Sequence, residues 1–204
     1  MKISYAIPVC NEHVELKELL SFLHEHIDEG DEIIVQCDQG NTLPEVYKVL
    51  DELNQSYIEF PLNGHFSNFK NNLKEHCTGD WIFQIDADEL PHESLITNLK
   101  ALLAVNTTTE MLLVPRVNTV DGLTQEHINK WRWNVNEKGW VNWPDYQTRI
   151  IQNNHKIKWQ NKVHEQIIGV STKGALPMEE EWCLYHPKDI KKQEIQNTLY
   201  DSLI

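Results

Sequence analysis

The amino-acid sequence predicts an α/β fold with a mostly parallel central β-sheet. Short apolar strand patterns alternate with amphipathic helix patterns through the first half of the chain, which is typical of βαβ units. The length of 204 residues suits one domain with a full hydrophobic core. Hydrophobic residues make up 40% of the chain and charged residues 24%, as in ordinary globular proteins. We therefore expect a single domain over residues 1–204.

Four strand patterns occupy the first half of the chain, and a helix pattern follows each of them. The strand patterns are short apolar runs and cover residues 3–9, 33–35, 57–60 and 81–85. The helix patterns keep apolar residues three or four apart and cover residues 16–27, 42–53, 66–77 and 95–103. Asn11 is predicted to cap the first helix, and Thr42 with Glu45 to form a capping box at the second.

This alternation ends near Val114. The strand-like pieces beyond it are shorter and cover residues 148–151, 156–159 and 163–168. Six of the seven tryptophans also lie in this second half, and a last helix is expected to begin near Lys188. The change of pattern divides the domain into two halves with different tasks, residues 1–114 and residues 115–204.

The chain is acidic, since 18 basic and 31 acidic residues give a formal net charge of −13. This balance argues against broad nucleic-acid binding, which needs basic patches, but allows a local basic site for a phosphorylated ligand. No apolar run approaches the roughly 20 residues that span a bilayer, and the chain begins with a strand pattern, so we expect neither a membrane span nor a signal peptide. The cysteines are far apart and predict free thiols in a reducing cytoplasm: Cys10, Cys37, Cys77 and Cys183.

Polar residues follow three of the predicted strands at the point where each strand ends. Asn11-Glu12 follows the first strand, Asp38 the second, and Asp86-Ala87-Asp88 the fourth. Ligands of parallel sheets bind at the carboxyl ends of the strands. We therefore expect these side chains to converge on one site.

Asp86 and Asp88 place two carboxylates one residue apart at the mouth of a buried strand. Mg²⁺ and Mn²⁺ prefer carboxylate oxygens, usually shared with the phosphates of a ligand. A metal held there would neutralise a diphosphate and stabilise it as a leaving group. The alternative is a polar turn in which Asp88 or Glu89 caps the following helix.

Several short motifs, taken in order, resemble a known protein family. They are Ala6–Glu12, Asp38, Phe66–Asn71, Gly79–Leu90, Trp143–Asp145, Gln147 with Arg149, Val163–Glu165, and His186 ahead of a lysine-rich segment. This set resembles a family 2 glycosyltransferase of the GT-A fold, of its lipopolysaccharide-core type. The resemblance covers nearly the whole chain. It implies a nucleotide-sugar-binding half over residues 1–114 and an acceptor-binding half over residues 115–204.

The resemblance also implies a nucleoside pocket in the first half. Pro8, Asn11 and Glu12 would line this pocket. Asp38 would accept a hydrogen bond from a pyrimidine base, most often uracil. The expected donor is therefore a UDP-sugar.

A diphosphate site is implied beside it. Lys70 would approach the diphosphate, at a position where the family usually has arginine; a solvated helix residue is the alternative. Within Asp86-Ala87-Asp88, Asp86 would contact the ribose or the metal, and Asp88 would bind the metal. His186 follows a strand-like segment, and its imidazole would complete the metal site or contact the diphosphate. The alternative for His186 is a lone histidine at a strand end.

Val163-His164-Glu165 is the candidate for base catalysis. Inverting transfer needs a group that removes the acceptor proton as the nucleophile attacks the anomeric carbon. Glu165 is the first choice and His164 the second. The alternative is a buried structural histidine at His164 and a surface carboxylate at Glu165.

Aromatic residues of the second half are candidates for a sugar-acceptor floor, since indole faces offer large apolar area. Core packing explains at least half of them equally well. Trp143 and Asp145 are the preferred acceptor-side residues among the candidates. The tryptophans considered are Trp131, Trp133, Trp140, Trp143 and Trp159.

The sequence thus predicts an inverting, metal-dependent glycosyltransferase of the cytoplasm, with Mn²⁺ or Mg²⁺ as cofactor and a nucleotide sugar as donor. A rival sugar-1-phosphate nucleotidyltransferase should have a glycine-rich loop after the first strand, whereas this turn is Pro8-Val9-Cys10-Asn11. A catalytically inactive nucleotide-sugar-binding module is a second rival, and it would be expected to lose the metal carboxylates or Glu165. The acceptor stays open between lipopolysaccharide core, another glycan, a peptide side chain and a modified nucleic-acid base.

Overall fold

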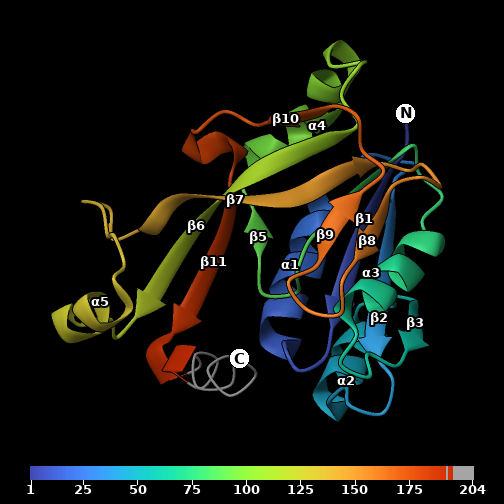
Figure 1. The fold of residues 1–204 in the computed structure, drawn as a ribbon. Helices are drawn as coiled ribbons and strands as arrows, with labels where there is room; N and C mark the ends of the chain where they lie inside the picture. Colours follow the sequence, from blue (N-terminus) through green and yellow to red (C-terminus); the bar gives the residue numbers. More distant parts are fainter. Residues whose placement is uncertain (192, 195–204) are drawn as a thin grey trace.

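A computed structural model describes residues 1–191, 193 and 194 and shows a large, mainly parallel sheet flanked by helices (Figure 1). The strand order across this sheet is β3 (Tyr57–Phe60), β2 (Glu32–Asp38), β1 (Ile3–Val9), β4 (Trp81–Gln84), β7 (Val141–Gln152), β6 (Met111–Asp121), β11 (Leu184–Asp189) and β5 (Leu90–Pro91), with β10 (Lys173–Ala175) paired to β6. β7 runs antiparallel to β4 and β6, and β5 runs antiparallel to β11. The α/β fold predicted from the sequence is confirmed.

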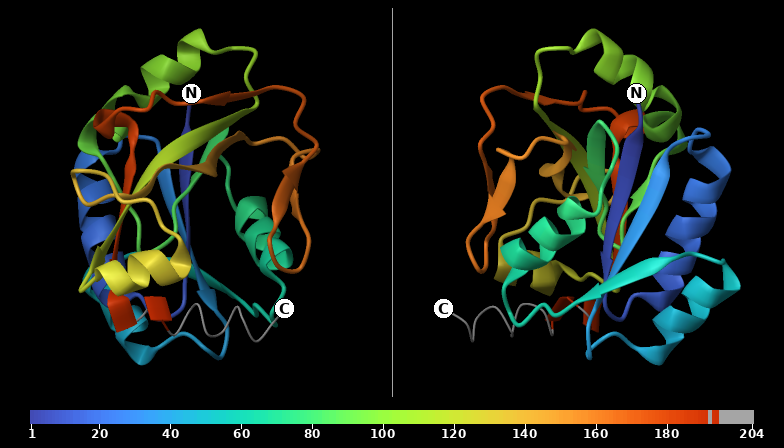
Figure 2. Two further views of the ribbon diagram at one scale, coloured as in Figure 1. Left: turned by 60° about the vertical axis from the view of Figure 1, so that its left-hand side comes forward. Right: turned by 90° about the vertical axis from the view of Figure 1, so that its right-hand side faces the viewer.

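Helices cover both faces of this sheet (Figure 2). One face carries α1 (His13–His26), α2 (Pro44–Glu52) and α4 (Glu93–Val105). The other face carries α3 (Phe66–Glu75), which packs against a two-stranded sheet of β8 (Lys158–Gln160) and β9 (Gln166–Ile168). The chain also contains α5 (Gln125–Trp131) after β6 and the short 3-10 helix η1 (Glu180–Trp182) before β11.

β1 shows why the sheet needs helices on both faces. Ile3, Tyr5 and Ile7 point into the larger hydrophobic cluster, where they meet the leucines of α1. Ala6 points the other way, into a second cluster that contains Leu73 of α3. Successive side chains of a strand point to opposite faces of the sheet. A strand with apolar side chains on both faces therefore needs helices packed on both.

The helix starts differ from two sequence predictions. Asn11 does not cap α1, because Glu12 occupies the N-cap position and makes no side-chain cap. The predicted capping box of Thr42 and Glu45 is also wrong. Leu43 is the N-cap of α2, and the Thr42 hydroxyl instead donates to the backbone carbonyl of Asp38 at 3.0 Å.

The second half contributes its longest strands to the same sheet. β7 begins at Val141, seven residues before the predicted piece at 148–151, and lies between β4 and β6. The predicted strand at 163–168 is shorter, because only Gln166–Ile168 forms β9. The last helix was predicted near Lys188, but β11 continues through Asp189. The chain becomes helical only at residue 190, and residues 192 and 195–204 lie outside the described residues.

A membrane span was not expected from the sequence. In the described part of the chain, no helix is both long enough and apolar enough to cross a bilayer.

Candidate active site

A pocket of about 390 Å³ opens at the carboxyl ends of β1, β2 and β4. Its lining brings together many of the residues singled out from the sequence: Pro8, Glu12, Asp38, Lys70, Asp86, Ala87, Asp88 and Glu165. In the described part of the chain, the lining does not include Asn11, His164 or His186. The pocket therefore lies where the strand ends were expected to meet, while the chemical role of each residue stays a prediction.

Asp38 forms a buried wall of the pocket and is 5% exposed. Its Oδ1 accepts a hydrogen bond from the backbone N–H of Leu62 at 2.8 Å, and its Oδ2 accepts one from the Asn41 amide at 3.1 Å. Each carboxylate oxygen has two lone pairs. Asp38 is therefore held rigidly and keeps accepting capacity for a further donor.

The turn after β1 forms a neighbouring wall. The Glu12 carboxylate accepts hydrogen bonds from the backbone N–H groups of Cys10, at 3.0 Å, and Asn11, at 2.9 Å. Burial, with help from the nearby carboxylates of Asp38 and Glu12, raises the pKa of the Cys10 thiol. Cys10 therefore presents a neutral thiol to the pocket at neutral pH.

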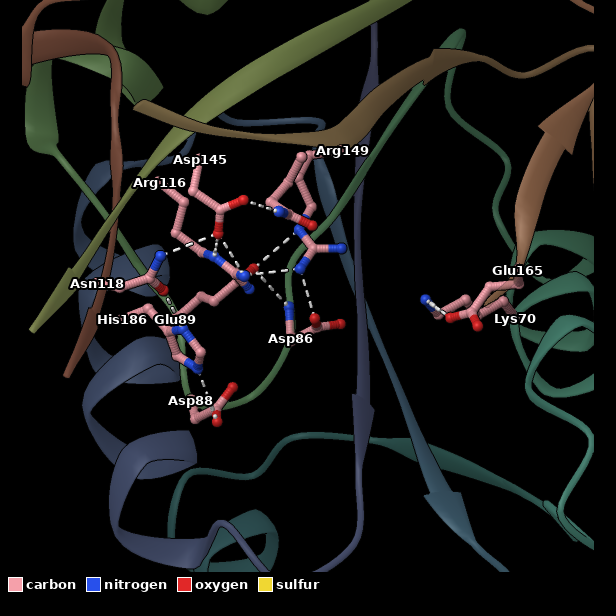
Figure 3. Close-up of polar contacts among 11 residues, drawn as sticks. Lys70, Asp86, Asp88, Glu89, Arg116, Asn118, Asp145, Arg149, Glu165 and His186 are labelled. Carbon is pink, nitrogen blue, oxygen red and sulfur yellow. Dashed lines mark hydrogen bonds and ion pairs between the residues drawn. The ribbon is translucent and has the colours of Figure 1, made fainter. Parts of the chain in front are cut away.

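Asp86 lies just beyond β4 and forms an ion pair with Arg149 of β7 (Figure 3). Burial alone would raise the pKa of the Asp86 carboxyl. The positive charge of Arg149, assisted by Lys70 and Arg116, outweighs burial and lowers this pKa to about 2. Asp86 is therefore ionised at neutral pH and already has a cationic partner within the protein.

Glu89 lies behind Asp86, and its side chain is fully buried. It accepts hydrogen bonds from Arg149 at 2.6 and 2.9 Å and from Arg116 at 2.9 Å. The backbone N–H of Asp86 donates to it at 3.2 Å. A buried carboxylate is tolerated when its lone pairs are satisfied in this way. Glu89 and Arg116 were missed as site residues. A charged residue within a strand that is otherwise apolar, such as Arg116 in β6, is a signal that could have identified them.

Asp145 lies on β7 beside Arg116 of β6 and accepts four hydrogen bonds. Two come from Arg116 at 2.6 and 3.0 Å, one from Asn118 at 2.9 Å and one from Gln147 at 2.7 Å. Burial would raise its pKa, but the charge of Arg116 and these hydrogen bonds hold the pKa below its usual range. Asp145 is therefore a poor proton acceptor and a support for its neighbours.

Asp88 and His186 are brought together from distant parts of the chain. The His186 Nε2 lies 3.2 Å from the Asp88 Oδ2, and the His186 Nδ1 lies 2.8 Å from the Asn118 Oδ1. His186 is 4% exposed, so its imidazole is held in place. Lys188, two residues along β11, has a pKa that burial lowers, although Asp88 opposes the shift.

The residues present fit a divalent metal only if a bound substrate supplies some of the metal's ligands. Within residues 1–191, 193 and 194, no group of three or more His, Cys, Asp and Glu side chains is arranged to hold a metal ion. Asp88 and His186 offer one carboxylate and one imidazole, whereas Asp86 is occupied by Arg149. Mg²⁺ is commonly bound by one or two carboxylates, substrate phosphates and water, so such a pair is a sufficient protein contribution.

Lys70 and Glu165 form an ion pair on the opposite side of the pocket, to the right in Figure 3. The side chains of Lys70 and Glu165 are 12% and 17% exposed. The Lys70 ammonium also lies 4.5 Å from the centre of the Trp159 ring, in a cation–π contact. The predicted phosphate ligand and the predicted base therefore neutralise one another in this structure.

His164 and the tryptophans do not face the pocket described above. His164 lies in the turn before β9 with a left-handed backbone, φ 52°. Trp143 packs edge-on against Trp140, with ring centres 4.8 Å apart, in a hydrophobic cluster with Val117 and Cys183. Core packing thus accounts for Trp140 and for one side of Trp143.

The family model for Glycosyl transferase family 2 matches residues 4–165. This match covers most of the chain, and the chain belongs to that family. The family predicted by resemblance is therefore confirmed. No curated protein sequence matches the chain.

Solved structures share the fold. TarS 1–349 from S. aureus, in complex with UDP-GlcNAc, superposes with a TM-score of 0.65 at 14% identity, over 92% of this chain and 59% of that chain. Glucosyl-3-phosphoglycerate synthase from Mycobacterium tuberculosis, in complex with Mg²⁺ and UDP, gives a TM-score of 0.51 at 16% identity, over 74% and 56%. At these identities the likeness establishes the GT-A fold, and the chain spans less than two thirds of either structure.

Proposed function

We propose that this chain transfers a sugar from a UDP-sugar to a hydroxyl of a glycan or other acceptor, with inversion at the anomeric carbon and with Mn²⁺ or Mg²⁺ bound. The observation that carries the proposal is that a single pocket is lined by Asp38, Asp88, Lys70 and Glu165. They would serve as a base-binding carboxylate, a metal-binding carboxylate, a phosphate-binding cation and a proton acceptor. Family membership supports it.

The donor nucleotide would lie along the carboxyl ends of β1 and β2. The remaining lone pairs of Asp38 would accept the N–H of uracil, and Glu12 and Pro8 would line the nucleoside site. TarS is similar in fold and has been solved with UDP-GlcNAc, which supports a uridine nucleotide. Asp86, held by Arg149, would face the ribose.

Asp88 and His186 would hold the metal together with diphosphate oxygens. When bound, the metal supplies positive charge that stabilises the departing diphosphate. The ion pair of Asp86 with Arg149 supports assigning Asp86 to the nucleotide. The two carboxylates of the Asp86-Ala87-Asp88 run would therefore have separate tasks.

Glu165 would act as the general base. In this structure its carboxylate is paired with Lys70. A diphosphate carries more negative charge than a carboxylate, so it would attract Lys70 and leave Glu165 available to the acceptor hydroxyl. His164 is the second candidate, since it is adjacent in the same turn.

The test is transfer from a radiolabelled UDP-sugar panel in Mn²⁺ and in EDTA, with the anomeric configuration of the product determined by NMR. Glu165→Gln keeps the shape but not the basicity, so we expect turnover to fall about 10²- to 10⁴-fold with UDP affinity retained. His164→Ala is the comparison variant. If His164→Ala is the slower enzyme, the base is His164. Retention of configuration would refute single displacement, and absence of any UDP-sugar turnover in the wild type would favour an inactive binding module.

A further inference from the structure

We propose that Asn118 is a positioning residue that fixes the tautomer of His186, so that the lone pair of His186 Nε2 is directed at the metal site. This inference rests on the proposed function, because metal binding by Asp88 and His186 belongs to it. It concerns three adjacent strands. β7 carries Asp145, β6 carries Asn118, and β11 carries His186.

The register of the sheet brings these side chains together. His186 is the direct neighbour of Asn118 across the β11–β6 pair, and Asp145 is the neighbour of Arg116 across the β7–β6 pair. Arg116 and Asn118 are two residues apart on one strand, so their side chains share a face. Figure 3 shows the resulting row of polar groups between Arg149 and Asp88.

The direction of each hydrogen bond follows from the carboxylate at one end of this row. The Asn118 Nδ2 lies 2.9 Å from the Asp145 Oδ2, and an ionised carboxylate can only accept. The amide nitrogen of Asn118 must therefore point at Asp145, which leaves its Oδ1 toward His186. Since Oδ1 can only accept, the hydrogen bond at 2.8 Å requires the proton of the imidazole to be on Nδ1.

With Nδ1 holding a proton, Nε2 is the ring nitrogen left to face Asp88, and it lies 3.2 Å from the Asp88 Oδ2. A proton on Nε2 would pair with this carboxylate. A divalent cation would replace that proton and take both atoms as ligands. Hydrogen bonds to the second ring nitrogen of a metal-binding histidine commonly set its tautomer and ring orientation.

Gln147 provides a matched control. It also donates to Asp145, at 2.7 Å, but to Oδ1 rather than Oδ2. Asn118→Leu and Gln147→Leu therefore each remove one amide donor from the same carboxylate. Only the first variant also removes the acceptor that faces His186.

The experiment has two readouts. Long-range ¹H–¹⁵N NMR of histidine-labelled, metal-free protein at pH 8, assigned with His186→Ala, reports the tautomer of His186. We expect a proton on Nδ1 in the wild type and in Gln147→Leu. A wild-type His186 whose Nδ1 carries no proton would overturn the proposal without reference to any variant's folding.

Mn²⁺ affinity in the presence of UDP, measured by EPR, is the second readout. We expect Asn118→Leu to weaken Mn²⁺ binding about 10- to 100-fold, Gln147→Leu to match the wild type, and the double variant of Asn118→Leu with His186→Ala to be no weaker than His186→Ala alone. Equal losses in Asn118→Leu and Gln147→Leu, or no loss in Asn118→Leu, would overturn this inference alone. If wild-type protein binds UDP equally in Mn²⁺ and in EDTA, metal dependence in the proposed function fails, and this inference fails with it.

Discussion

The side chain of Glu89 is fully buried, and two guanidinium groups make its negative charge compatible with that burial. Arg149 also binds Asp86, so one cation serves a structural carboxylate and a carboxylate of the pocket. The adjacent Asp88 has a histidine as its partner instead. Neighbouring carboxylates thus differ in their electrostatic surroundings because their partners differ, although their own chemistry is the same.

Arg149→Met tests the structural part of this arrangement. The change keeps most of the side-chain volume but removes the main partner of a buried carboxylate, so we expect the free energy of unfolding to fall by about 3–5 kcal/mol. Urea denaturation followed by circular dichroism measures it. Lys17→Met, which removes an ion pair with Glu52 at the surface, should change stability little. Similar small changes in both variants would contradict the structural role of Arg149.

The lowered pKa of Asp86 predicts a pH dependence. Its pKa is about 2 in the folded protein and about 3.9 in an unfolded chain. The ionised form therefore stabilises the fold above about pH 3.9, and this contribution is lost as the pH falls toward 2. The side chain is 35% exposed, so the effect is screened and modest.

Asp86→Asn isolates this contribution. We expect the melting temperature of the variant to lie below that of the wild type at pH 6 and the gap to close between about pH 4 and pH 2. Other carboxylates titrate in both proteins, and the difference between the two curves cancels them. A gap that stays constant down to pH 2 would show that the Asp86 carboxylate is not stabilised by Arg149.

At the scale of elements, β7 shows how far the sequence pattern extends. The strands of the first half follow a simple apolar pattern and were predicted within a few residues. In β7 only Ile150 and Ile151 fit such a pattern, while Asp145 and Arg149 interrupt it. Those charges are satisfied by partners 29 and 60 residues away along the chain. Local periodicity therefore missed eight of the 12 residues of the strand.

The same limit applies to the site. The topology rule located the pocket, because Asp38, Asp86 and Asp88 follow strands that end at one edge of the sheet. It does not indicate which carboxylate is already neutralised. The ion pairs of Asp86 with Arg149 and of Glu165 with Lys70 depend on strand order and register across the two halves, which one sequence alone does not display.

The turn that carries Glu165 depends on the packing of β8 against α3. The Asn71 side chain donates to the backbone carbonyl of Trp159 at 2.8 Å and accepts from its N–H at 2.8 Å. Asn71→Leu leaves both backbone groups without this partner, at a cost of about 1–3 kcal/mol. We expect faster amide hydrogen exchange at Trp159 and lower kcat, with KM for the donor little changed. Asn68→Leu, at an exposed position of the same helix, should alter neither quantity; equal effects of both variants would contradict the anchoring role.

At the scale of the whole molecule, the two predicted halves share one sheet and one pocket. β7 of the second half lies between β4 and β6, so the halves cannot separate without breaking strand pairs. Lys70 and Glu165 are 95 residues apart along the chain and meet at the pocket. The protein has a net charge of −13 and is proposed to bind an anionic diphosphate. Donor binding therefore depends more on the few cations near the pocket than on the overall charge.

Lys70→Met tests whether this contact couples donor binding to the base. A charge-assisted hydrogen bond contributes about 1.5–3 kcal/mol, so we expect UDP affinity to fall roughly 10- to 100-fold while uridine affinity changes little. Isothermal titration calorimetry measures both ligands. Lys74→Met is the matched control, because Lys74 lies one turn further along α3 and donates to the Asn154 carbonyl at 3.0 Å instead.

Glu165→Gln gives the complementary result, since it removes the carboxylate that competes with the diphosphate for Lys70. We expect Glu165→Gln to bind UDP at least as tightly as the wild type while it loses turnover. If the diphosphate displaces Glu165 from Lys70, only Lys70→Met loses UDP affinity. Weaker UDP binding in Glu165→Gln, or equal loss of UDP and uridine in Lys70→Met, would mean that the ion pair supports the shape of the pocket and does not respond to the donor.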